Sequence, residues 1–175
     1  MNEIKIFAPA TIANLSCGFD ILGVCLDKIG DTITVRKTKN KGLFIKKVTG
    51  QQLSTDILLN VAGVSATALL NETKVNCGFE IEIHKGIKPG SGIGSSAASS
   101  AGSVFAINKL IGEPYTNKQL IKFAMQGEMT ASDSKHADNV AAVLLGGFTF
   151  VKSSIENDFF KLNTPIEIAF TVIHP

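Results

Sequence analysis

Three glycines alternate with other residues, and small side chains follow them, in Lys88-Pro89-Gly90-Ser91-Gly92-Ile93-Gly94-Ser95-Ser96-Ala97-Ala98-Ser99. Apolar alternation from Cys77 to His84 predicts a strand before this stretch, and apolar spacing after it predicts a helix from about Gly94 to Ile111. Glycine reaches backbone dihedrals that other residues resist, and it lets the backbone approach a ligand closely. Free N–H groups at the start of a helix attract phosphate, because the helix dipole is positive there. A strand, a glycine-rich loop and a helix in this order therefore predict a phosphate-binding loop.

Two better-known phosphate motifs do not fit this loop. The P-loop motif needs a lysine after its last glycine, whereas Ser95 follows Gly94. The dinucleotide fingerprint would need a glycine at position 95, which is again serine. A glycine-rich turn capped by serine, with no ligand, is the structural alternative. The hydroxyls of Ser95 and Ser96 and the charge of Lys88 favour phosphate, and one hydroxyl could reach a phosphate-bound Mg²⁺.

The rest of the chain predicts strands first and helices later. Strands are expected at residues 3–8, 31–37, 42–48, 148–152, 159–162 and 166–173. Further helices are expected from Ser54 or Thr55 to about Leu69, from Thr116 or Asn117 to about Glu128, and from Asn139 to Leu145. Pro9-Ala10-Thr11 is expected to end the first strand, and residues 14–20 have the composition of a loop. This order predicts an α+β, two-layer fold rather than a regular βαβ repeat, in one domain over residues 1–175.

The composition excludes several classes of protein. Of the 175 residues, 45% are apolar and 18% are charged, which is typical of a globular domain and not of a disordered chain. No apolar run approaches the ~20 residues of a membrane span, and the amino terminus lacks the pattern of a secretory signal, so we expect a cytoplasmic protein. A net charge of +2, a single arginine (Arg36) and the absence of tryptophan argue against a nucleic-acid partner. Three cysteines without metal-binding spacing indicate free thiols.

The glycine-rich stretch resembles the phosphate loop of the GHMP small-molecule kinases, which reads Pro-x-x-x-Gly-Leu-Gly-Ser-Ser-Ala-Ala. Here the proline is shifted by one position, and Ile93 stands in place of leucine. Two other segments resemble the homoserine kinase family in particular: Phe-Ala-Pro-Ala-Thr-Ile-Ala-Asn-Leu-Ser-Cys-Gly-Phe-Asp-Ile-Leu-Gly at 7–23, and His-Ala-Asp-Asn-Val-Ala-Ala-Val-Leu-Leu-Gly-Gly-Phe at 136–148. Ser16-Cys17 departs from the Gly-Pro that the family often has there. The resemblance implies the fold of the GHMP-kinase amino-terminal domain, which is similar to the second domain of a ribosomal protein, and a carboxy-terminal domain that this chain lacks.

The resemblance also implies a reaction and its participants. ATP would be the co-substrate, Mg²⁺ the metal and L-homoserine the small-molecule substrate, giving O-phospho-L-homoserine in threonine biosynthesis. The partners would include no nucleic acid and no membrane, with a homodimer as the assembly to test. The nucleotide-binding residues would be Asn60, Lys88, Pro89, Gly90, Ser91, Gly92, Ile93, Gly94, Ser95, Ser96, Ala97 and Ala98. The metal ligands would be Ser96 and Glu128, and the substrate-binding residues Asn14, Asp20, His136 and Asn139.

Asn139 is the expected catalytic residue, although an amide cannot take a proton at neutral pH. It can orient the acceptor hydroxyl, and positioning is a large part of catalysis where the transition state of phosphoryl transfer is loose. Asp138 remains an alternative as a base, and a hydrogen-bonded loop position is the structural alternative for His136. Asp20 would pair with the substrate ammonium, or it would cap a turn. Arg36, the single arginine, lies in mid-strand and away from the motifs. The resemblance implies that the arginines that bind the substrate carboxylate lie outside these 175 residues.

Two other functions remain open at this point. A different GHMP kinase would act on another small alcohol and would share the same loop. A nucleotide-binding module would bind ATP without turnover, and we expect this behaviour of the 175 residues alone.

Overall fold

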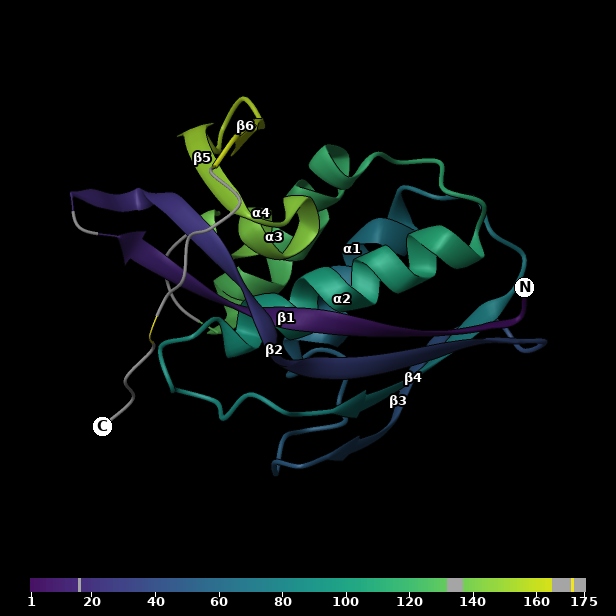
Figure 1. Cartoon of the computed structure of the whole chain (residues 1–175). Helices are drawn as coiled ribbons and strands as arrows, with labels where there is room; N and C mark the ends of the chain where they lie inside the picture. The colour runs from purple at the N-terminus through teal and green to yellow at the C-terminus, as the bar shows by residue number, and fades with distance from the viewer. Residues whose placement is uncertain (16, 132–136, 165–170, 172–175) are drawn as a thin grey trace.

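The fold is one six-stranded sheet with four helices packed against it, within residues 1–15, 17–131, 137–164 and 171, which the computed structural model describes (Figure 1). The strands are β1 (Glu3–Leu15), β2 (Gly18–Thr38), β3 (Leu43–Thr49), β4 (Gly78–His84), β5 (Phe148–Ser153) and β6 (Asp158–Leu162). The helices are α1 (Val61–Asn71), α2 (Ser95–Leu110), α3 (Asn117–Ala131) and α4 (Asp138–Leu145). The predicted two-layer α+β fold is confirmed. None of the helices in the described ranges is long and apolar enough to cross a lipid bilayer.

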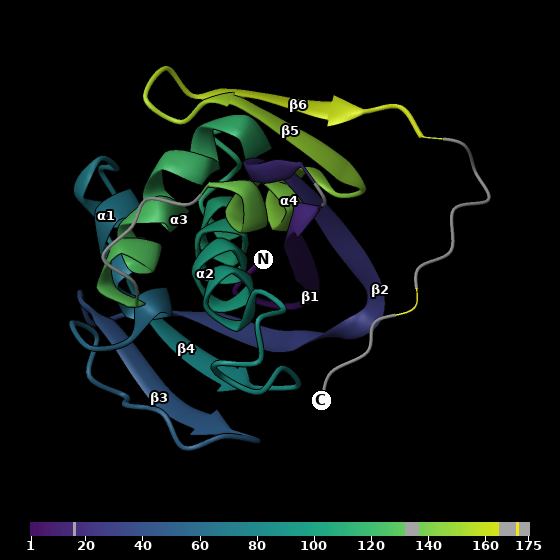
Figure 2. The same ribbon diagram turned by 90° about the vertical axis from the view of Figure 1, so that its left-hand side faces the viewer.

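The sheet has the order β3-β4-β2-β5-β6, and β1 pairs with β2. Only β3 and β4 are parallel among the pairs described. One half of β2 pairs with β4, and its other half pairs with β5. Because β2 twists between these two halves, the sheet curls around the helices, with β3 and β4 on one side and β5 and β6 on the other (Figure 2).

The expected strand break at Pro9-Ala10-Thr11 is wrong. β1 continues through these residues to Leu15, and its register with β2 shifts between Pro9 and Thr11. A bulge leaves one residue out of the hydrogen-bond ladder, so a proline without an N–H is tolerated there. The expected loop at 14–20 is also wrong for most of its described residues, because β1 runs to Leu15 and β2 begins at Gly18. The strand predicted at 31–37 is the second part of the longer strand β2.

The helix starts show which polar residues act as caps. α1 begins at Val61 rather than near Ser54, because Asn60 is its N-cap and accepts a 3.0 Å hydrogen bond from the Ala62 N–H. The Ser54 hydroxyl instead accepts the N–H of Asp56 in a turn, and such local bonds compete with a helix. α3 begins after Thr116 as predicted and ends at Ala131, three residues beyond the expected end. The strand expected at 166–173 lies outside the described residues, apart from residue 171.

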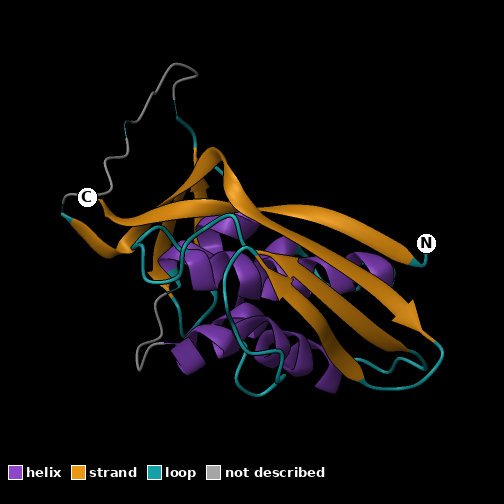
Figure 3. Ribbon diagram, turned by 90° about the horizontal axis from the view of Figure 1, so that it is seen from below, coloured by secondary structure: helices purple, strands orange, loops and turns teal. Residues whose placement is uncertain are grey.

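Helix α2 is buried on almost every side, which explains its small residues. Alternate side chains of the strands, such as Ile33 and Ile81, meet it from the sheet. A Cβ atom placed on Gly102 would lie 2.4 Å from Ile33 Cδ1, and one on Gly127 of α3 would lie 2.6 Å from Ser100 Oγ. Glycine, alanine and serine therefore let the sheet and α3 approach α2 closely. Figure 3 shows the helices packed against one face of the strands. This packing fixes the start of α2 at the end of β4.

Candidate active site

The glycine-rich loop between β4 and α2 has the backbone that its sequence predicts. Gly90, Gly92 and Gly94 have φ angles of 75°, 75° and 68°, in the left-handed region that favours glycine. Gly94 is the N-cap of α2 and supplies no side-chain hydrogen bond, so the first N–H groups of the helix keep their donors for another acceptor. The loop opens onto a cavity of about 520 Å³. Its lining comprises Leu53, Ser54, Leu59, Asn60, Val61, Lys85, Pro89, Gly90, Gly92, Gly94, Ser95, Ser96, Ser99, Glu128, Thr130 and Asn139.

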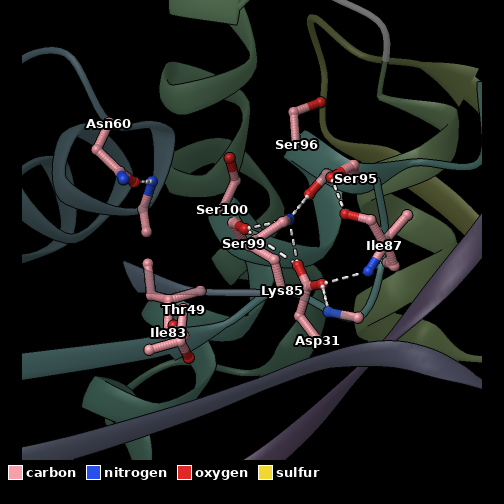
Figure 4. Close-up of polar contacts among 12 residues, drawn as sticks. Asp31, Thr49, Asn60, Ile83, Lys85, Ile87, Ser95, Ser96, Ser99 and Ser100 are labelled. Carbon is pink, nitrogen blue, oxygen red and sulfur yellow. Dashed lines mark hydrogen bonds and ion pairs between the residues drawn. The ribbon is translucent and has the colours of Figure 1, made fainter. Parts of the chain in front are cut away.

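A buried ion pair lies directly under this loop. Lys85 Nζ pairs with Asp31 Oδ2 and also donates to the Ser95 carbonyl at 2.7 Å and to Ser99 Oγ at 2.9 Å (Figure 4). Asp31 Oδ1 accepts the backbone N–H groups of Gly86 and Ile87 at 3.0 and 3.1 Å. The pair thus joins β2, the first residues of the loop and the first turn of α2.

The electrostatics of this pair follow from its burial. Both side chains are almost fully buried, at 1% exposure for Lys85 and 0% for Asp31. Burial lowers the pKa of Lys85, and the charges of Asp31 and Glu128 act in the opposite direction. Since Lys85 also lines the cavity, it places a positive charge beside any phosphate that the loop would hold.

Sequence reasoning missed Asp31 and Lys85, although the alternation of the strands carried a signal. Asp31 shares the inward face of β2 with Ile33 and Val35. Lys85 continues the inward series of β4 after Ile83, one position beyond its last pairing with β2. A carboxylate and an ammonium at the inward positions of two adjacent strands are the mark of a buried pair.

Glu128 reaches the same cavity from α3. It is 9% exposed, and its carboxylate accepts hydrogen bonds from Ser96 Oγ at 2.9 Å and Ser100 Oγ at 3.1 Å. Burial raises the pKa of Glu128, while the two serine hydroxyls and Lys85 oppose that rise. Glu128 is therefore a buried residue of the cavity lining and does not face water at the end of α3.

The Ser96 and Glu128 oxygens suit a hard cation. Mg²⁺ in kinases takes one or two carboxylates together with phosphate oxygens and water, and it does not need a cage of protein ligands. Among the described residues, no group of three or more His, Cys, Asp or Glu side chains is placed to hold a metal on its own. The donor set therefore fits Mg²⁺ accompanied by a nucleotide.

Asn139 lies near the start of α4 and faces the cavity from the side of Gly94. Its Oδ1 accepts a 2.8 Å hydrogen bond from Thr11 Oγ1, and its Nδ2 donates to Asp138 Oδ1 at 3.3 Å. Asp138 itself is 1% exposed and does not line the cavity, so its place does not favour the alternative of a base. The sequence placed Thr11 only in the expected strand break at Pro9-Ala10-Thr11 and gave it no role at the site.

Asn60 also lines the cavity, and it is 5% exposed rather than facing water. Its Nδ2 donates to the Ser54 carbonyl at 2.7 Å, while its Oδ1 caps α1 (Figure 4). A contact with the adenosine part of a nucleotide remains a prediction for this residue.

Other predicted site residues are not gathered around the cavity. Asn14 and Asp20 are exposed at the end of the β1–β2 hairpin, where the Asp20 N–H donates to Asn14 Oδ1 at 3.0 Å. Arg36 pairs with Glu3 and Glu82 on the sheet, which agrees with its expected absence from the site. The loop residues outside the lining are Lys88, Ser91, Ile93, Ala97 and Ala98, of which the two alanines are in the core. His136 lies outside the described residues.

A family model described as "GHMP kinases N terminal domain" matches residues 57–147. The chain therefore belongs to the GHMP kinases, a family of small-molecule kinases. Curated homoserine kinases are among the relatives that it matches over its whole length. The one from Methanococcus vannielii is 39% identical over 177 residues, which cover 100% of this chain and 58% of that protein. The one from Chloroherpeton thalassium is 37% identical over 187 residues and is covered to 59%.

Solved structures give the same picture. A crystal structure of homoserine kinase from Cytophaga hutchinsonii superimposes with a TM-score of 0.88 at 45% identity, over 94% of this chain and 53% of that one. Mevalonate kinase from Methanococcus jannaschii, at 15% identity and a TM-score of 0.68, covers 93% of this chain and 56% of its own length, and it shares the fold alone. The chain spans just under three fifths of the curated relatives named above.

Proposed function

We propose that this protein transfers the γ-phosphoryl group of ATP to the hydroxyl of L-homoserine and releases O-phospho-L-homoserine and ADP. The observation that carries the proposal is that the glycine-rich loop, the Ser96–Glu128 pair and Asn139 line one cavity. The identity to homoserine kinases over the whole chain supports the choice of acceptor.

The reaction assigns a task to each group around the cavity. The acceptor oxygen bonds to the γ-phosphorus, the bond from that phosphorus to the bridging oxygen breaks, and the electron pair leaves with ADP. The hydroxyl proton passes to water or to the transferred phosphoryl group, because the Asn139 amide cannot accept it. Asn139 orients the hydroxyl, while Lys85 and the α2 N–H groups neutralise phosphate charge. Ser96 and Glu128 would hold Mg²⁺, which would neutralise phosphate charge further.

The ammonium and the carboxylate of the substrate each need a partner of opposite charge. Asp20 and Asn14, at the hairpin end, are the proposed partners of the substrate ammonium. The substrate carboxylate needs a cation, and arginine binds it best because its planar group donates two parallel hydrogen bonds. We propose that the remaining length of the relatives carries this cation, and that the protein acts in the cytoplasm, where ATP is available.

The test is ADP release in a coupled assay with L-homoserine and a panel of other small alcohols. The assay compares this chain with a form that spans the full length of its relatives. We expect homoserine-dependent release from the long form and ATP binding without turnover from the 175 residues. Release with mevalonate and none with homoserine would assign a different GHMP kinase activity.

Glu128→Gln tests the metal site separately from the acceptor. The glutamine keeps the volume and one oxygen for the serine hydroxyls, but it loses the charge that Mg²⁺ requires. We expect the affinity of the chain for ATP with Mg²⁺ to fall on the order of tenfold, as for the loss of one charged ligand, and binding without Mg²⁺ to change little. Calorimetric titration measures both, with Ser100→Ala as the control. Unchanged Mg²⁺ dependence would remove Glu128 from the metal site.

A further inference from the structure

Thr11 contacts both sides of the proposed reaction. It is fully buried in β1, next to the bulge at Pro9. Its backbone N–H donates to the Ile93 carbonyl of the glycine-rich loop at 3.1 Å. Its side-chain hydroxyl donates to Asn139 Oδ1 at 2.8 Å, across 128 positions of sequence. One residue is thus bonded to the loop that would hold the phosphoryl donor and to the side chain that would orient the acceptor.

The hydrogen bonds around Asn139 allow only one orientation of its carboxamide. Asp138 Oδ1 accepts the backbone N–H of Asn139 at 2.8 Å and also accepts the Asn139 NH₂ group at 3.3 Å, so an amide oxygen in that place would face another acceptor. Oδ1 then faces Thr11, whose hydroxyl must donate rather than accept. Among the described residues, each end of the carboxamide makes one of these hydrogen bonds, and Oδ1 has a second lone pair and Nδ2 a second hydrogen. Asn139 lines the cavity, where these are available to an acceptor hydroxyl.

Gly94 shows how closely these groups pack. A Cβ atom on Gly94 would lie 2.0 Å from Thr11 Oγ1 and 3.2 Å from Asn139 Oδ1. Gly94, the N-cap of α2, therefore packs against the Thr11 hydroxyl and the Asn139 carboxamide. A methyl group on Gly94 would not fit there. A rotation of the Asn139 carboxamide would break its hydrogen bond to Thr11.

We propose that Thr11 is a positioning residue for phosphoryl transfer: its hydroxyl holds the Asn139 carboxamide in the orientation that aligns the acceptor hydroxyl with the phosphate loop. This inference rests on the proposed function. The alternative is that the hydrogen bond from Thr11 to Asn139 contributes only to the stability of the fold. The two hypotheses predict different values of kcat for a variant that lacks the Thr11 hydroxyl but keeps the shape of the side chain.

The first experiment uses Thr11→Val, which keeps the shape, and Thr11→Ser, which keeps the hydroxyl, in a form spanning the full length of the relatives. We expect Thr11→Val to lower kcat on the order of tenfold with little change in KM for ATP, because misplacing an acceptor by about 1 Å costs up to a hundredfold. Thr11→Ser should restore most of kcat. Thr149→Val is the matched control, since Thr149 is also fully buried and its hydroxyl donates to the Gly23 carbonyl, outside the cavity. An unchanged kcat in Thr11→Val, or an equal loss in Thr149→Val, would overturn the proposal.

A double-mutant cycle with Asn139→Ala separates positioning from stability. If Thr11 acts through Asn139, Thr11→Val has little further effect on kcat once the carboxamide is gone. The same fold-loss in both backgrounds would contradict the proposal.

A third readout does not depend on turnover and uses the 175-residue chain itself. The side-chain amide resonances of Asn139, identified by their loss in Asn139→Asp, should shift and exchange faster with water in Thr11→Val. Unchanged resonances would refute the orienting bond. If the long form shows no homoserine-dependent ADP release while this shift is present, the proposed substrate fails but the orienting bond stands.

Discussion

Asp31 and Lys85 show how a single residue can determine the position of a loop. Besides pairing with each other, Asp31 accepts backbone N–H groups from the start of the loop after β4, and Lys85 donates to a carbonyl and a hydroxyl in the first turns of α2. Removing one member leaves the other charge buried without a counter-charge. We expect Lys85→Met or Asp31→Asn to lower the free energy of unfolding by about 3–5 kcal/mol.

The double variant distinguishes a pair from two separate contacts. Asp31→Asn with Lys85→Met removes both charges, so its loss of stability should be smaller than the sum of the two single losses. Urea unfolding measures all of these variants. Additive losses would show that the two side chains act independently.

Ser91 is a single residue whose side chain we expect to lower the stability of the fold. Its hydroxyl oxygen is buried and has no hydrogen-bond partner within the described residues. Such a group costs about 1–3 kcal/mol, so Ser91→Ala should melt at a temperature equal to or above that of the wild type. Ser95→Ala is the control, because the Ser95 hydroxyl donates to the Ile87 carbonyl at 3.1 Å and its loss should lower the melting temperature. A destabilised Ser91→Ala would show that the hydroxyl has a partner in solution.

At the level of elements, the start of α2 is defined by two glycines with different requirements. Gly90 and Gly94 both have a positive φ, but a Cβ on Gly90 meets nothing within 4 Å, whereas one on Gly94 meets Thr11 Oγ1. Gly90→Ala should therefore cost only the backbone strain of about 1–2 kcal/mol. Gly94→Ala should cost more, and it should also weaken ATP binding, because the helix start must move. If Gly90→Ala and Gly94→Ala lower the free energy of unfolding in urea equally, the residues beside Gly94 can move to make room for a methyl group.

The elements also show what a sequence can predict. The alternation of β4 and the small residues of α2 predicted both elements to within one or two residues, because periodicity reflects which face is buried. The start of α1 was misplaced, since Ser54 and Asn60 are equally good caps by residue type and only tertiary contacts select Asn60. The bulge at Pro9 and the pairing of Thr11 with Asn139 depend on contacts across the sheet and the chain, which no local pattern contains.

The candidate site, like the helices and strands, was predictable only where its residues form a local pattern in the sequence or match the family motifs. The loop glycines and the Ser96–Glu128 pair came from local composition and from the family resemblance, and the structure brings them to one cavity. Asp31, Lys85 and Thr11 came from neither source. Their side chains matter because of what lies beside them after folding, and this is a property of packing.

For the molecule as a whole, the outer face of the sheet carries a network of ion pairs. Arg36 bonds to Glu3 and Glu82, while Lys46 and Lys47 reach Glu82 at 3.5 Å from β3. Burial alone would raise the pKa of Glu82, but the hydrogen bond and charge of Arg36 and the charge of Lys47 hold that pKa below its usual value. A carboxylate with a lowered pKa stabilises the folded chain above its unfolded pKa of about 4.3, and this contribution disappears as the pH falls through the folded value.

Glu82→Gln tests this dependence. The difference in melting temperature between the wild type and Glu82→Gln should be largest near neutral pH and should shrink below about pH 4. Thermal unfolding followed by circular dichroism across this range measures it. A difference that stays constant with pH would mean that the charge of Glu82 does not contribute to stability.

The long strand β2 also has a consequence for how the molecule comes to its folded state. β1 and β2 are neighbours in sequence and can pair early, whereas β5, which pairs with the first half of β2, follows more than a hundred residues later. Contacts that close long loops form slowly, because the entropy of closure comes before the gain of the contact. The hydrogen bond between Thr11 and Asn139 also closes a long loop, across 128 positions of sequence. During synthesis on the ribosome, the glycine-rich loop therefore leaves the ribosome before Asn139, the residue that we propose orients the acceptor.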